Sequence, residues 1–164
     1  MTETDVSLVK TEPADGPVTI KTVEKIIKAE LVIGGKLINL AEVADPSMGT
    51  PWKLGKGLMT IYFCDVFDGD GELIGKSAGS MIILGEDPET GHLMEHITEQ
   101  IQLADGTITA WGTHDRTDVL QQKWSTYRAE GTSGRYLGLT GTRSYRIYAL
   151  DDPTFPLDGV WELG

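Results

Sequence analysis

The chain has one cysteine, few basic residues and no long apolar run, and each shortage excludes a class of protein. Because Cys64 has no second cysteine to pair with, an internal disulfide is impossible and the disulfide-rich secreted scaffolds are excluded. The 14 Lys and Arg against 25 Asp and Glu give a net charge of −11. Nucleic acids and anionic membranes bind clustered Lys and Arg, so we expect neither as a partner. No apolar run approaches the roughly 18 residues of a membrane-spanning helix.

Length and composition predict one domain with a tail in front of it. A chain of 164 residues that is 40% hydrophobic is long enough to bury one core. Residues 1–17 combine acidic side chains and prolines with little apolar periodicity, so we expect a disordered acidic tail before a single domain at 18–164. No apolar export segment opens the chain, and a cytoplasmic protein is the simplest expectation.

Short apolar stretches recur along the chain at nearly regular spacing, with turn residues between them. The separators 68–71, 85–91 and 104–106 carry the Asp, Gly and Pro that hairpin turns need. The predicted strands are 57–68, 73–84, 92–103, 106–115, 121–128, 141–150 and 158–163. Consecutive hairpins of this kind predict an all-β fold, a small up-and-down antiparallel β-barrel of about eight strands with an apolar lumen.

The segment before the first of these strands fits two patterns. A helical stripe is formed by Ile20, Val23, Ile27 and Leu31. Strand-like alternation is formed by Val23, Ile27, Ala29, Leu31 and Ile33. We favour a strand over 18–33, whereas a helix there would act as a lid over the barrel mouth. Residues 34–56 contain too many Gly and Pro for a regular element and predict a long loop.

The sequence gives little support for a metal centre. Acidic residues crowd 65–72, but their spacing departs from that of a calcium loop and predicted strands flank them. His92 and His96 share a strand face, yet residues four apart in a strand stand roughly 13 Å from each other. We therefore expect no metal, and histidines, His114 included, that face solvent or form hydrogen bonds.

Covalent and nucleotide chemistry are equally unsupported. No serine sits in a Gly-x-Ser-x-Gly elbow, and Cys64 lies within a predicted strand without a neighbouring base. The glycine-rich segment 130–141 invites a phosphate site, but no Lys-Ser/Thr pair closes it, and a strand follows it instead of a helix. A close turn at the rim of a sheet explains these glycines better, because glycine permits positive φ and close backbone approach.

The same glycine-rich segment carries a family resemblance. Residues 131–141 run Gly-Thr-Ser-Gly-Arg-Tyr-x-Gly-x-x-Gly, which resembles the glycine signature of the allene oxide cyclase and dirigent type of antiparallel β-barrel. Ile-Gln-Leu-Ala-Asp-Gly at 101–106 and Lys-Trp at 123–124 narrow the resemblance to the bacterial spirotetronate cyclases. Asp-Gly-Glu-Leu-Ile-Gly at 70–75, followed by Gly79, is similar to the same barrels.

The resemblance implies an enzyme of natural-product biosynthesis. Its substrate would be a linear polyketide polyene, and the reaction an intramolecular [4+2] cycloaddition between its diene and an exocyclic alkene on its tetronate or tetramate ring. Such a Diels-Alderase needs no cofactor, metal or covalent intermediate, because folding the substrate in the lumen brings the reacting atoms together. Two alternatives stay open: a non-catalytic carrier of an apolar molecule, and an allene oxide cyclase-like, dirigent-like or oxygen-heterocycle-forming protein.

Alternation along 141–150 identifies the candidate lumen face. Arg143, Tyr145, Ile147 and Ala149 share one side of that strand, which we expect to point inward. The resemblance implies that Tyr127 and Tyr145 are catalytic pocket tyrosines, with Tyr127 as a donor to the carbonyl that activates the alkene. Ordinary core packing is the alternative for both.

The remaining candidate residues are expected to bind substrate. They are Ile97, Glu99, Trp124, Arg143 and Ile147. By the resemblance, Ile97 stands where the family has an aromatic residue, and Ile147 is an apolar wall residue. Glu99 shares a face with Ile97, so a buried carboxylate there would need a partner such as Arg143. The alternative for this pair is a salt bridge at the rim without a catalytic role.

The prediction of the oligomeric state rests on apolar residues that would face outward from the barrel. Both faces of 58–67 carry apolar residues, so one face is expected to fill the barrel while the other contacts a second subunit. We predict a homodimer. The stretch 155–161 is expected to supply either the closing strand or a dimer contact.

Overall fold

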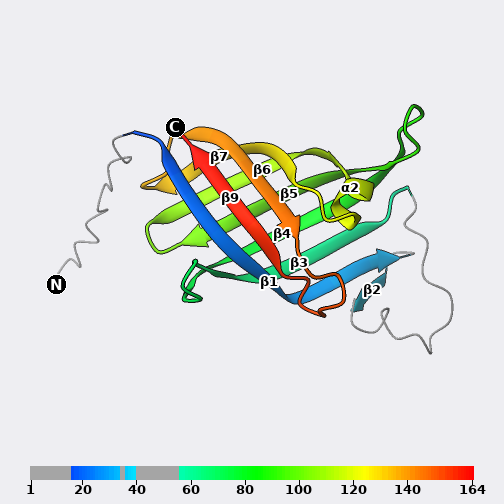
Figure 1. The fold of residues 1–164 in the computed structure, drawn as a ribbon, viewed down its shortest axis with the longest axis horizontal. Coiled ribbons are helices and arrows are strands. Elements are labelled where there is room, and N and C mark those ends of the chain that lie inside the picture. Colours follow the sequence, from blue (N-terminus) through cyan, green and yellow to red (C-terminus); the bar gives the residue numbers. More distant parts are fainter. Residues whose placement is uncertain (1–15, 34–35, 40–55) are drawn as a thin grey trace, which may run out of the picture.

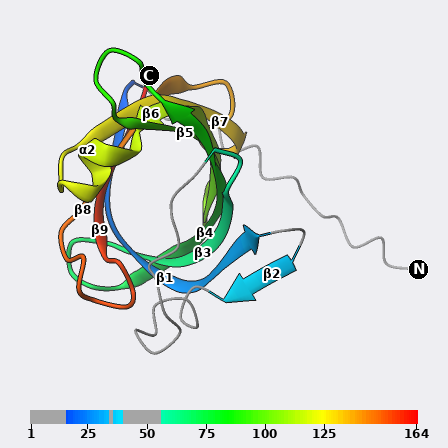
Figure 2. The same cartoon turned by 90° about the vertical axis from the view of Figure 1, so that its right-hand side faces the viewer.

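The computed structural model describes residues 16–33, 36–39 and 56–164, and eight of its strands close into an antiparallel barrel (Figures 1 and 2). Each strand pairs with the next along the chain, and β9 returns to β1 with Val18 opposite Leu163. The barrel strands are β1 (Val18–Ile33), β3 (Met59–Phe67), β4 (Leu73–Glu86), β5 (Leu93–Leu103), β6 (Gly106–Asp115), β7 (Ser125–Gly134), β8 (Thr140–Ile147) and β9 (Leu157–Leu163). The predicted all-β, up-and-down barrel is confirmed.

The first long segment is a strand, so the prediction of a strand over 18–33 is confirmed and the lid helix is wrong. β1 pairs with β9 along its first half and with β3 along its second. Within the predicted loop 34–56, a short strand β2 (Lys36–Asn39) pairs with the end of β1 outside the barrel ring (Figure 2). The rest of that loop, and residues 1–15 of the predicted tail, lie outside the described residues.

The largest boundary errors fall around β7. The predicted strand 121–128 begins too early, because residues 121–124 form the turn after a short helix, α2 (Arg116–Leu120), which is capped by Asp115, and β7 starts at Ser125. The strand then continues into the glycine-rich segment as far as Gly134, and β8 starts only at Thr140. The close turn lies between them: Gly131 meets the Tyr136 backbone so closely that a Cβ would stand 1.7 Å from its carbonyl oxygen.

Alternation of side chains fills the interior of the barrel. Along β8, Arg143, Tyr145 and Ile147 are buried while their neighbours are more exposed, as strand geometry requires. The predicted inward face is therefore confirmed for these three residues, whereas Ala149 lies beyond the end of β8. Figure 2 looks into one end of the barrel, where α2 and the connection between β8 and β9 lie on the rim. No helix in the described ranges is long and apolar enough to cross a membrane.

Candidate functional site

The lumen contains a cavity of about 340 Å³, a size typical of small-molecule sites, which span roughly 300–1,000 Å³. Its wall is largely apolar and includes Ile26, Ala29, Leu31, Met81, Ile97, Ile147 and Leu157. Leu120 of α2 and Phe155 of the β8–β9 connection also line it. Phe155 has φ of 42°, a left-handed conformation that residues other than glycine seldom adopt.

A buried ion pair lies inside this cavity. Arg143 of β8 contacts Glu24 of β1 through two bonds, Nη1 to Oε2 at 2.8 Å and Nη2 to Oε1 at 2.9 Å. Its Nε donates to Glu99 Oε1 of β5 at 2.7 Å. All three side chains are almost fully buried. The predicted pairing of Arg143 with Glu99 is confirmed, and it is internal, so the alternative of a rim salt bridge is wrong.

Two tyrosines complete what we call the Arg143 cluster, which consists of Glu24, Tyr62, Glu99, Tyr127 and Arg143. Tyr62 of β3 donates its hydroxyl to Glu99 Oε2 at 2.6 Å, and Tyr127 of β7 donates its hydroxyl to Glu99 Oε1. Glu99 therefore accepts three hydrogen bonds, and both phenolic protons are already engaged. The indole of Trp161 lies 4.4 Å from the Arg143 guanidinium carbon and adds a cation–π contact.

Burial and the guanidinium compete in setting the charges of this cluster. Burial raises the pKa of Glu24, although Arg143 opposes the rise. For Glu99 burial acts in the same direction, but Arg143 and the donated hydrogen bonds outweigh it and lower the pKa. Burial and the neighbouring Glu99 raise the pKa of Tyr62 and Tyr127, so both phenols stay protonated and act as donors. The cluster thus holds an ionised Glu99 against Arg143.

A second buried polar group, here called the Tyr145 cluster, consists of Glu95, His114 and Tyr145. His114 Nε2 of β6 lies 3.0 Å from Glu95 Oε1 of β5 and 3.3 Å from the Tyr145 hydroxyl of β8. Arg116 Nη1 stands 3.7 Å from the same Glu95 oxygen. The rings of His114, Tyr127 and Tyr145 pack together with centroids 5.7–6.1 Å apart. This packing joins the two clusters.

Comparison with known proteins gives the barrel its family. The model of the allene oxide cyclase barrel-like domain matches residues 44–154. The chain belongs to the allene oxide cyclase-like barrel family. Among solved structures, it is similar to AbnU, an exo-specific intermolecular Diels-Alderase, with 28% identity and a TM-score of 0.70 over 90% of this chain and 96% of that one.

Two further solved structures share the barrel fold. A nonspecific heme-binding cyclase that catalyses [4 + 2] cycloaddition during neoabyssomicin biosynthesis has 23% identity and a TM-score of 0.71, over 90% of this chain and 66% of its own. The Diels-Alderase AbmU from Streptomyces koyangensis has 23% identity and a TM-score of 0.71, over 90% and 63% respectively. The predicted resemblance to this group of cyclase barrels is confirmed.

The allene oxide cyclase-like barrel brings six of the seven predicted site residues to one cavity. They are Ile97, Glu99, Tyr127, Arg143, Tyr145 and Ile147. Trp124 is the exception, because it precedes β7 and its side chain is 45% exposed. Its ring lies 5.0 Å from the Arg146 guanidinium carbon, away from the cavity wall. The expectation that Trp124 contacts a substrate in the lumen is therefore not supported by its position.

Sequence reasoning missed three polar members of the site. Glu24 and Tyr62 complete the Arg143 cluster, and His114 is the partner of Tyr145. A signal existed for Tyr62, which belongs to an alternating apolar strand. Glu24 lies on the face of 18–33 opposite the predicted apolar alternation.

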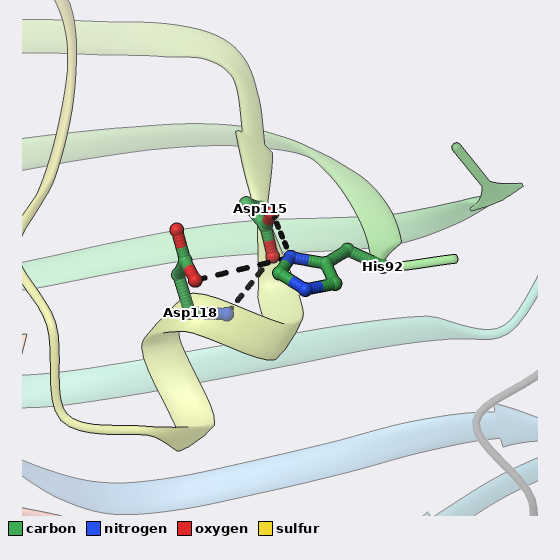
Figure 3. A group of neighbouring side chains, drawn as sticks. All are labelled: His92, Asp115 and Asp118. Carbon is green, nitrogen blue, oxygen red and sulfur yellow. Dashed lines mark hydrogen bonds and ion pairs between the residues drawn. The ribbon is translucent and has the colours of Figure 1, made fainter. Parts of the chain in front are cut away.

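A third polar group, the rim cluster of His92, Asp115 and Asp118, offers three ligand atoms within 4.8 Å of one another (Figure 3). His92 Nδ1 contacts Asp115 Oδ2 at 2.6 Å and lies 3.8 Å from Asp118 Oδ1. Asp115 also accepts from the Asp118 backbone N–H at 2.9 Å, and Lys123 Nζ lies 3.0 Å from the Asp118 carboxylate. These contacts fix the start of α2 to β5 and β6.

Proposed function

We propose that this protein is a cyclase that catalyses an intramolecular [4+2] cycloaddition of a linear polyketide polyene carrying a tetronate or tetramate ring. The observation that carries the proposal is an apolar cavity with a buried polar wall, inside a barrel that is 28% identical to a Diels-Alderase over nearly its whole length. A flexible polyene would pack against the apolar residues of the wall, and a ring carbonyl would form a hydrogen bond with its polar residues.

The cavity would act by restricting the substrate. Because diene and alkene are tethered, the full bimolecular advantage of about 7–11 kcal/mol is not available. Freezing flexible torsions is worth roughly 0.5–1.5 kcal/mol per group, so several frozen torsions lower the barrier by several kcal/mol. A single folded conformer also gives a single stereoisomer. A hydrogen bond to the alkene-activating carbonyl adds a smaller electrostatic contribution.

No covalent step is needed in this proposal, and the chemistry of the lumen supports that view. Cys64 lines the cavity, but burial raises the pKa of its thiol to about 12, which leaves little thiolate at neutral pH. The carboxylate of Glu99 is engaged by Arg143 and two phenols. Cofactor independence is part of the proposal and is tested with it.

The decisive experiment is a conversion assay without added cofactors. The purified protein is incubated with a linear polyene that bears an exocyclic-methylene tetronate, and diene absorbance, mass and chiral chromatography are followed. A single stereoisomer of unchanged mass is the expected product, with the same rate in EDTA. Binding without conversion would replace the cyclase by a carrier.

A matched pair of variants ties conversion to the lumen. Ala29→Phe places a ring in the cavity, because Ala29 is buried in its wall. Ala104→Phe adds the same ring to the exposed turn between β5 and β6. Conversion should be lost in the first variant and kept in the second. A separate diene and alkene supplied together test the intermolecular reaction that AbnU performs, since its product would carry the summed mass.

A further inference from the structure

The hydrogen-bond assignment of His114 determines where the proton of Tyr145 points. His114 Nε2 lies 3.0 Å from a Glu95 oxygen that also faces the Arg116 guanidinium at 3.7 Å. An oxygen with a cation on one side is an acceptor, so the imidazole donates to it from Nε2. The second ring nitrogen, Nδ1, is buried and has no partner among the described residues.

The unpartnered Nδ1 supports the same tautomer independently. A buried N–H without an acceptor is rare in proteins, whereas a buried acceptor without a donor is tolerated more often. The neutral imidazole therefore carries its proton on Nε2 and leaves Nδ1 bare. A protonated Nε2 cannot accept a hydrogen bond, so the Tyr145 hydroxyl, 3.3 Å away, shares this N–H with Glu95 as a second and weaker acceptor.

The proton of Tyr145 is then free for an occupant of the cavity. In the described part of the chain, the hydroxyl forms no hydrogen bond with a side chain other than His114. Burial raises the pKa of Tyr145, so the proton is retained. Tyr62 and Tyr127 also line the cavity, but both donate to Glu99. Of the three tyrosines in the wall, Tyr145 is the one with an uncommitted donor.

We infer that Tyr145, positioned by His114 and Glu95, is the tyrosine of the wall whose hydroxyl donates a hydrogen bond to a neutral carbonyl oxygen of the ligand. This assignment deepens the proposed function, on which the identity of the carbonyl as the alkene-activating one rests. It moves the donor role from Tyr127, where the family resemblance had placed it, to Tyr145.

The test uses a ligand that cannot cyclise. A γ-lactone with a decyl chain and a ¹³C-labelled carbonyl is bound to the full-length protein, and the carbonyl stretch is recorded by difference infrared spectroscopy. We expect a band shifted to lower frequency in the wild type, lost in Tyr145→Phe and kept in Tyr127→Phe. Affinity for the lactone should fall roughly threefold to tenfold in Tyr145→Phe, the effect of one neutral hydrogen bond.

The positioning role of His114 has its own readout. His114→Phe removes the N–H that holds the Tyr145 oxygen and should broaden the lactone band, because the hydroxyl no longer has one orientation. His114→Gln supplies an amide N–H and should restore a narrow band. Tyr148→Phe, which changes an exposed phenol just beyond β8, should leave the spectrum as in the wild type.

The outcomes separate this assignment from the proposed function. A wild-type band without a shift, no binding of the lactone, or a shift that survives in Tyr145→Phe would overturn the assignment, even if polyene conversion is observed. A shift that depends on Tyr145 in a protein that converts no polyene would support the donor assignment while removing the cyclase proposal. A shift lost in Tyr127→Phe and kept in Tyr145→Phe would return the donor role to Tyr127.

Discussion

The Arg143 and Tyr145 clusters line the same lumen, and they differ in how their hydrogen-bond donors are used. In the Arg143 cluster, the guanidinium and both phenols all donate to carboxylates. In the Tyr145 cluster, the imidazole donates to the carboxylate of Glu95, and the Tyr145 hydroxyl has no acceptor among the described residues. A fully satisfied polar group stabilises the fold, while spare donor capacity in a cavity is available to a ligand. We therefore assign a structural role to the Arg143 cluster and a role in ligand recognition to the Tyr145 cluster.

Removing Arg143 should have the largest effect on stability. Arg143→Met leaves Glu24 and Glu99 buried without their cation, and breaking a buried pair in this way costs about 3–5 kcal/mol. The free energy of unfolding in urea measures the loss. Arg146→Met is the matched control, because this half-exposed arginine of β8 pairs with Asp158 at the surface and should cost about 1 kcal/mol or less. Equal losses in the two variants would contradict the structural role given to the Arg143 cluster.

The two phenols should respond differently to the same change. Tyr127→Phe removes a donor to an ionised carboxylate and should lower the free energy of unfolding by about 1.5–3 kcal/mol. Tyr145→Phe removes a hydroxyl whose one hydrogen bond within the described residues is long, so the loss of stability should stay below about 1 kcal/mol. Urea unfolding of both variants without ligand makes the comparison. The reverse order would show that Tyr145 is the more tightly held donor and would undermine the division between the clusters.

A glycine of β9 provides the space in which the Arg143 cluster is built. A Cβ at Gly159 would stand 2.3 Å from Thr22 Oγ1, 2.4 Å from Arg143 Nη1 and 2.5 Å from Glu24 Oε2. Gly159→Ala should therefore displace the ion pair and cost about 1–3 kcal/mol, as other overpacked cores do. Gly69→Ala meets nothing within 4 Å and is the control. Unfolding curves that coincide for the two variants would mean that the cluster can move without loss.

The inward face of β8 could be predicted from sequence because strand alternation is local. Once turn residues had bounded 141–150, a period of two placed Arg143, Tyr145 and Ile147 together, and a buried arginine called for an acid such as Glu99. The failure at Trp124 has a different origin. Trp124 was expected in the site because Lys-Trp at 123–124 belongs to the family resemblance, but it lies between α2 and β7, where no strand alternation directs its side chain into the lumen.

Glu24 was missed because a bulge reverses the faces of β1. The register against β3 shifts between Ile26 and Lys28. Before the shift, Thr22 and Glu24 are buried, and after it Ala29 and Leu31 are buried. The alternation predicted over 18–33 therefore gives the buried residues correctly only in the second half of β1. A bulge depends on the pairing of two strands far apart in sequence, and nothing in the residues of β1 alone marks it.

Substitutions in the rim cluster should have the smallest effect on stability. This cluster also pairs a histidine with a carboxylate, but its side chains are partly exposed, so water competes for their hydrogen bonds. Asp115→Ala removes the cap of α2 and the contact with His92, and should cost on the order of 1 kcal/mol. The hydrogen bonds from the Asp118 backbone and from His92 outweigh burial and lower the pKa of Asp115. A lowered pKa gives stability that is present above the unfolded value of about 3.9 and is lost as the pH falls through the folded value.

The difference in stability between wild type and Asp115→Ala should therefore shrink as the pH falls below about 3.9. Urea unfolding at a series of pH values measures it, with Asp118→Ala as a neighbouring variant that keeps the cap. Since the rim cluster lies outside the cavity wall, lactone binding should not change in Asp115→Ala. A loss of binding larger than that in Tyr145→Phe would mean that the position of α2 controls the lumen, and the recognition role would then extend from the Tyr145 cluster to the rim.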